Sequence, residues 1–88
     1  TYSASINSAN QLKRLTVFSN LRKMPEAQSA FFAIPATANE KPEAYNQLAR
    51  GYANARMWSQ ARSTVEEMRR NLPNHPQTVK TMVGVGMI

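Results

Sequence analysis

Apolar residues recur at three- and four-residue intervals along most of this chain. Such spacing places them on one face of an α-helix. Prolines, glycines and small polar residues separate these stretches, so the pattern predicts five helical segments and an all-α fold. The predicted apolar stripes are Leu12, Leu15 and Phe18; Ala27, Phe31 and Ile34; Tyr45, Leu48, Ala49 and Tyr52; Ala61, Val65, Met68 and Leu72; and Val79, Met82 and Val83.

The expected helix starts carry local signals. Pro25 and Pro42 stand where helices can begin, because the N–H that proline lacks has no helical partner in the first turn. Ser8 and Ser59 are expected as N-caps of the first and fourth helices. Residues 1–7 are small and polar, and we expect them to form a loose N-terminal segment.

The stripes repeat with a period of 34 residues, which is the mark of a repeat architecture. A helical hairpin cannot bury its apolar stripes alone, whereas stacked hairpins make a continuous core. The period predicts a degenerate hairpin at 8–41, a better matching one at 42–75, and the first helix of a third at 76–88. The pairs at this offset are Ala27 and Ala61, Phe31 and Val65, Ile34 and Met68, Pro42 and Pro76, Tyr45 and Val79, and Leu48 and Met82.

Residues 42–76 resemble a tetratricopeptide repeat, in the run Tyr45, Leu48, Ala49, Tyr52, Ala61, Val65 and Pro73 and in the closing Leu72-Pro73-Asn74-His75-Pro76. Val65 and Met68 depart from the usual residues of that family. The same stretch is similar to a pentatricopeptide repeat, in Tyr45-Asn46-x-Leu48, Gly51-Tyr52, Ala61 and Glu67-Met68. Either resemblance implies a right-handed superhelix of helical hairpins, here with about two and a half repeats.

The tetratricopeptide resemblance implies that the first helix of each hairpin lines a concave groove for a partner protein. Asparagine can hold an extended peptide by its backbone, and arginine and lysine can grip carboxylates. The set suits an acidic or C-terminal peptide segment, although ordinary exposed polar positions would look the same. The implied groove residues are Asn46, Arg50, Ala53, Asn54, Lys80 and Lys13.

The pentatricopeptide resemblance implies contact with single-stranded RNA instead. Asn46 occupies the base-reading position of the first helix, and Asn74 or His75 the second position at the repeat end. Arg50 and Lys80 could then meet phosphates. Eleven basic residues against five glutamates give a net charge of +6, which favours RNA modestly and equally suits an acidic protein partner.

Catalysis has little support in the composition. The chain has no cysteine, no aspartate and one histidine, so a catalytic triad or a metal cluster of the usual ligands cannot be assembled. We expect no enzyme activity, metal or cofactor. No apolar run reaches the roughly 20 residues that span a membrane. The basic, acid-free segment 1–23 resembles the end of a mitochondrial or plastid transit peptide, and fits a core helix equally well.

The C-terminal segment is apolar, although a solenoid usually ends in a polar cap. We therefore expect this end to continue into further chain or to dock on a partner, through Val79, Met82, Val83, Val85, Met87 and Ile88. Tyr52 and Trp58 are expected in the core. Together these features predict an interaction scaffold within a larger protein or assembly.

Overall fold

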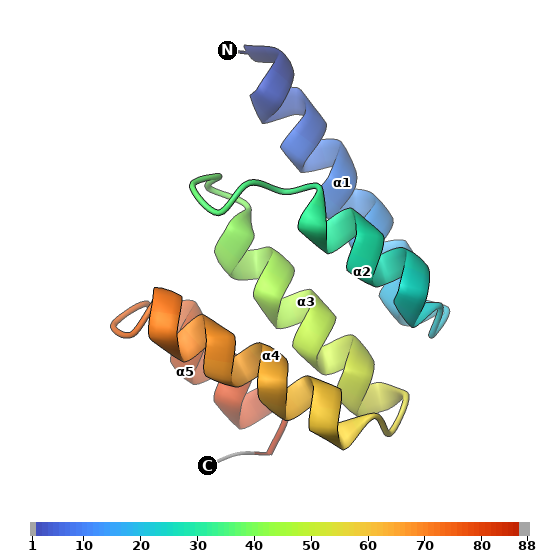
Figure 1. Ribbon diagram of the computed structural model, residues 1–88, viewed down its shortest axis with the longest axis vertical. Coiled ribbons are helices and arrows are strands. Elements are labelled where there is room, and N and C mark those ends of the chain that lie inside the picture. The colour runs from blue at the N-terminus through green and yellow to red at the C-terminus, as the bar shows by residue number, and fades with distance from the viewer. Residues whose placement is uncertain (1, 87–88) are drawn as a thin grey trace.

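The computed structural model describes the backbone of residues 2–86 and the side chains of residues 8–86. This part of the chain is all-helical, so the predicted all-α class is confirmed (Figure 1). The five helices are α1 Tyr2–Asn20, α2 Met24–Phe32, α3 Lys41–Asn54, α4 Trp58–Asn71 and α5 Pro76–Gly84.

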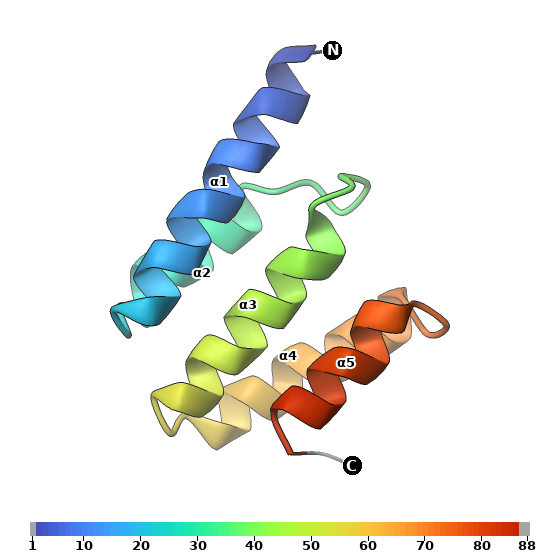
Figure 2. The same ribbon diagram turned by 180° about the vertical axis from the view of Figure 1, so that it is seen from behind.

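The helices form two layers around α3. Consecutive helices pack as hairpins, α1 with α2 and α3 with α4, and α3 also contacts α1 and α5. Figure 2 shows α1, α3 and α5 on one side of the molecule with α2 and α4 behind them. The face made by α1, α3 and α5 therefore presents residues from three helices that are distant in sequence.

The helix starts predicted from Pro25 and Pro42 are observed, whereas those predicted from Ser8 and Ser59 are not. Pro25 and Pro42 lie in the first two positions of α2 and α3. In contrast, α1 begins at Tyr2, so residues 2–7 are helical and the expected loose segment is wrong. No proline or glycine precedes Ser8 to stop the helix, and Ser8 is buried within it. Met57, not Ser59, is the N-cap of α4.

Each hairpin has one turn between its two helices, and the two turns have the same backbone form. Arg22 and Arg56, 34 residues apart, adopt left-handed backbone angles, with φ of 59° and 63°. In each turn the next N–H reaches five residues back, from Lys23 to the Phe18 carbonyl and from Met57 to the Tyr52 carbonyl, at 2.8 Å in both. These bonds satisfy carbonyls left free at the helix ends.

The predicted stripes of the first four helices supply most of the core. Leu15, Ile34, Val65 and Met68 are almost completely buried. The Phe31 ring packs edge-on against the Tyr45 ring, with centroids 4.9 Å apart. Trp58 is an exception, because it is the first residue of α4 and its side chain is exposed; its expected place in the core is wrong.

Lys41 is buried at the junction of α2 and α3. Its ammonium donates to the carbonyls of Phe31 at 3.2 Å and Ile34 at 2.9 Å. The same nitrogen lies 3.7 Å from the centre of the Phe31 ring. Burial lowers the pKa of Lys41, and the nearby negative charge of Glu67 opposes that shift. The cation therefore joins the C-terminal end of α2 to the start of α3.

Candidate functional site

Asn46 is not available to a ligand. Its side chain is 2% exposed. The amide Nδ2 donates to Glu43 Oε2 at 3.1 Å, and Oδ1 accepts from Thr81 Oγ1 at 3.0 Å. The expectation that Asn46 faces an open groove or reads an RNA base is wrong, because α5 packs across this part of α3 and Thr81 covers it. Asn46 instead joins two helices.

Arg50 and Asn54 do lie together, in a polar pocket between α1 and α3. We call this the α1–α3 pocket; its volume is about 280 Å³. The stem of Arg50 also passes beside Gly84 of α5, where an added Cβ would lie 3.4 Å from Arg50 Cδ. Arg50 therefore touches the middle of the three-helix face. The lining residues are Thr16, Ser19, Asn20, Gln47, Arg50, Gly51 and Asn54.

The α1–α3 pocket offers hydrogen-bond donors and positive charge without a carboxylate in its lining. Ser19 Oγ is buried and has no hydrogen-bond partner among the described side chains. In that same part of the chain the one ion pair is Arg69 with Glu66, so Arg50 has no acidic partner there. A guanidinium beside free hydroxyl and amide groups suits a carboxylate or phosphate oxygen.

The sequence reasoning missed the α1 side of this pocket. Gly51 carried the signal, because a glycine inside a helical pattern often marks close approach of another element. An added Cβ at Gly51 would lie only 2.9 Å from Ser19 Cβ and Oγ. Ser19 and its neighbours gave no periodic signal of their own.

The remaining predicted groove residues do not line the pocket. Lys13 is exposed on α1, one helical turn before Thr16, and Lys80 is exposed on α5. Ala53 is partly buried against the core. Asn74 is exposed, whereas His75 caps α5, with Nδ1 accepting from the Gln77 N–H at 3.0 Å. The structure therefore brings Arg50 and Asn54 together and gives His75 a local structural role.

Glu43 connects α3 to α5. It accepts hydrogen bonds from Asn46, from Gln47 at 3.0 Å and from Gln77 at 2.7 Å. Burial alone would raise the pKa of Glu43, but the three amide donors and the charge of Lys80 lower it below its ordinary value. The ionised carboxylate is thus the favoured form in the folded chain.

Acid is expected to weaken the contribution of Glu43 to stability. Because its folded pKa lies below the ordinary value of 4.5, the unfolded chain binds this proton first as the pH falls. The contribution is complete above that value and is lost as the pH falls through the folded pKa. Urea unfolding of wild type and Glu43→Gln from pH 7 to pH 3 measures this. The gap between their unfolding free energies should narrow toward pH 3, and a constant gap would contradict the assignment.

The predicted apolar end is only partly exposed. Val79 and Val83 are exposed, and Met82 is half-buried. Val85 is buried beside Ala49 and Val65, because the chain after α5 folds back against α3 and α4. It also lines a hollow between α4 and the end of α5. Met87 and Ile88 lie outside the described residues.

The described part of the chain holds no group of three or more histidine, cysteine or acidic side chains placed to bind a metal ion. None of its helices combines the length and apolar character that a membrane crossing requires.

Comparison of the sequence with models of protein families, with curated proteins and with solved structures returned no match.

Proposed function

We propose that this chain is a non-catalytic interaction scaffold that binds an acidic segment of a protein partner in the α1–α3 pocket. The observation that carries the proposal is that two polar groups lining this pocket lack partners among the described residues. Arg50 stands there without an acidic partner, and the buried Ser19 hydroxyl makes no hydrogen bond within the described region. A ligand carboxylate would satisfy both groups.

The scaffold is proposed to be a right-handed superhelix of tetratricopeptide-like hairpins. Support comes from features spaced by 34 residues, beyond the apolar stripes. The left-handed turns at Arg22 and Arg56 have this spacing, and so do Glu43 and Gln77, which bond to each other across successive first helices. Such repeats bind partners on the face made by the first helix of each hairpin, where Arg50 lies.

RNA contact is the second candidate, favoured by the net charge of +6. It now rests on charge alone, because the Asn46 side chain is held by Glu43 and Thr81 and cannot reach a base. Binding of that kind would weaken steeply with salt and would show little base preference.

The proposal is tested by measuring binding of a fluorescent hexaglutamate peptide and of a single-stranded oligouridylate to the wild-type chain across a salt series. Arg50→Ala should weaken peptide binding about tenfold or more, since hydrogen bonds to charged groups contribute about 1.5–3 kcal/mol. Arg14→Ala is the matched control, because Arg14 is also an exposed arginine but lines a different pocket of α1. It should change the affinity less than twofold.

Ser19→Ala separates a binding role from a structural one. Because the hydroxyl makes no hydrogen bond within the described region, its removal should leave the unfolding free energy nearly unchanged while weakening peptide binding. Equal losses in Arg50→Ala and Arg14→Ala would overturn the proposed site. Tighter binding of the oligouridylate than of the peptide would favour the RNA candidate.

A further inference from the structure

One face of α5 is bare where the equivalent face of α3 is covered. Val79 and Val83 are 56% and 60% exposed. The residues 34 positions earlier are Tyr45 and Ala49, and both are buried. Helix α4 covers that part of α3, and the Tyr45 hydroxyl donates to Glu67 of α4 at 3.0 Å. In the described part of the chain, no helix stands to α5 as α4 stands to α3.

A groove runs between α4 and α5, and Val79 of this bare face lines it. It consists of two hollows of about 660 and 460 Å³, which are neighbours because Glu66 lines both. Trp58 lies at one end and Pro73 at the other. Since α4 has 14 residues, the groove runs beside a helix roughly 21 Å long. We call it the α4–α5 groove.

The repeat shows what the α4–α5 groove lacks. Its residues Arg62, Glu66 and Gly86 stand 34 positions after Gln28, Phe32 and Tyr52. Those three line the earlier hollow between α2 and α3, which is closed on its other side by residues of α4. The two sites are therefore equivalent, and within residues 2–86 no helix closes the later one.

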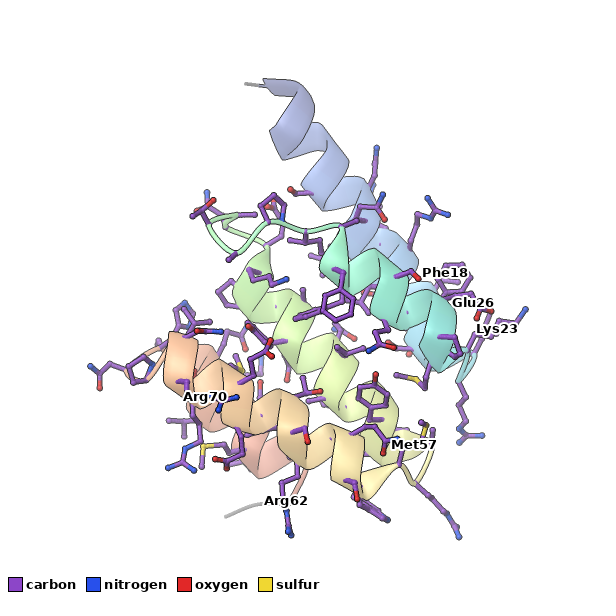
Figure 3. All side chains as sticks on the ribbon, viewed as in Figure 1. Phe18, Lys23, Glu26, Met57, Arg62 and Arg70 are labelled. Atoms are coloured by element: carbon purple, nitrogen blue, oxygen red, sulfur yellow. The ribbon has the colours of Figure 1, made fainter. Side chains whose placement is uncertain are left out.

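The charges around the groove add a second requirement. Arg62, Arg69 and Arg70 line it from α4, against a single acidic lining residue, Glu66. Glu66 is already paired with Arg69 at 3.1 Å. Figure 3 shows Arg62 and Arg70 toward opposite ends of α4. With three arginines and one glutamate, the lining of the whole groove is net positive.

From these observations we propose that the α4–α5 groove binds an amphipathic α-helix of a partner protein, with an apolar stripe toward Val79 and Val83 and acidic flanks. The helix runs antiparallel to α5, as α4 does to α3. This second interface lies on α4 and α5, separate from the α1–α3 pocket. It rests on the 34-residue repeat of the proposed scaffold but not on binding in that pocket.

The probe that tests this is a peptide with the sequence of residues 57–72, carrying Arg62→Glu, Arg69→Glu and Arg70→Glu. The peptide keeps the apolar stripe with which α4 covers α3. The three substitutions make it acidic, so that its charge is opposite to that of the groove. We expect it to bind the full chain and to gain helical circular dichroism on binding. A scrambled peptide of the same composition should not bind, and the unchanged, basic sequence should bind at least tenfold more weakly.

Variants of the chain locate the peptide. Val79→Asp with Val83→Asp should weaken binding tenfold or more. Val17→Asp is the matched control, because Val17 is 53% exposed on the distant α1, and it should leave the affinity unchanged. Arg50→Ala should also have no effect, which separates this interface from the α1–α3 pocket.

Three results would overturn the proposal. They are absence of binding by the designed peptide, equal losses in the Val17 and Val79/Val83 variants, or self-association of the wild-type chain that Val79→Asp abolishes. The last would make a second copy of this chain the occupant, and sedimentation equilibrium of the wild type would detect it.

Discussion

Phe31→Ala is expected to destabilise the chain by about 3–5 kcal/mol, the usual cost of emptying a buried phenylalanine site. Phe31 is buried between α2 and α3, against the Tyr45 ring and beneath the Lys41 ammonium. The substitution therefore leaves a cavity and removes the ring that faces a buried cation. At the usual stability per residue, a chain of 88 residues has a free energy of unfolding of about 4–13 kcal/mol, so this single change removes a substantial fraction of it.

Phe32→Ala is the matched control for this prediction. Phe32 is adjacent in sequence and identical in chemistry, but its side chain is exposed. We expect it to cost less than about 1 kcal/mol. Thermal unfolding followed by circular dichroism measures both variants, and Phe31→Ala should lower Tm by about 12 °C or more. Similar shifts in the two variants would show that the core does not centre on Phe31.

Gly51→Val is expected to cost about 2–3 kcal/mol by forcing α1 away from α3. An added Cβ at Gly51 would lie 2.9 Å from Ser19 Cβ, and that atom is fixed to the backbone of α1. Valine adds two further methyl groups to this overlap. The gain in helix propensity over glycine is less than about 1 kcal/mol and does not offset it.

Gly84→Ala, on α5, is the contrasting substitution and should not destabilise the chain. Its Cβ would meet only the flexible stem of Arg50, at 3.4 Å, so it should be neutral or slightly stabilising. Adding Ser19→Gly to Gly51→Val removes the overlapping atoms and should restore part of the loss. Denaturant unfolding of the single and double variants measures this coupling. If Gly51→Val were neutral, the close approach of α1 and α3 would be wrong.

The fold was predictable to the extent that it depends on apolar periodicity and proline. Most residues of the stripes predicted for the second, third and fourth helices are buried as expected, because each stripe has a regular spacing. The start of α1 was missed because residues 2–7 contain neither a helix breaker nor an apolar stripe. The arginines with positive φ were missed because that conformation is uncommon for residues other than glycine and asparagine.

The candidate site was less predictable, because it depends on how neighbouring helices pack. The position of Asn46 on the first helix of a hairpin is compatible with an open groove, but Thr81 lies 35 residues further on and closes over it. The burial of Lys41 has no local signal in the sequence, since nothing near it indicates that the carbonyls of Phe31 and Ile34 would accept from its ammonium. Arg50 and Asn54 are exposed, as their groove positions require, because no neighbouring helix in the described region covers them.

Helix α5 is attached mainly by polar contacts, and we expect it to detach before the other helices unfold. Its buried face presents Thr78 and Thr81, and it is held by the Gln77–Glu43 and Thr81–Asn46 hydrogen bonds. Because the fully buried residues of α5 are both threonines, little apolar burial holds it, so it can detach at a lower free energy than the whole chain unfolds. In native-state hydrogen exchange, the amides of α5 should therefore form a separate, less protected unit. A helix bound along α5 would merge that unit with the rest and make unfolding a single cooperative event.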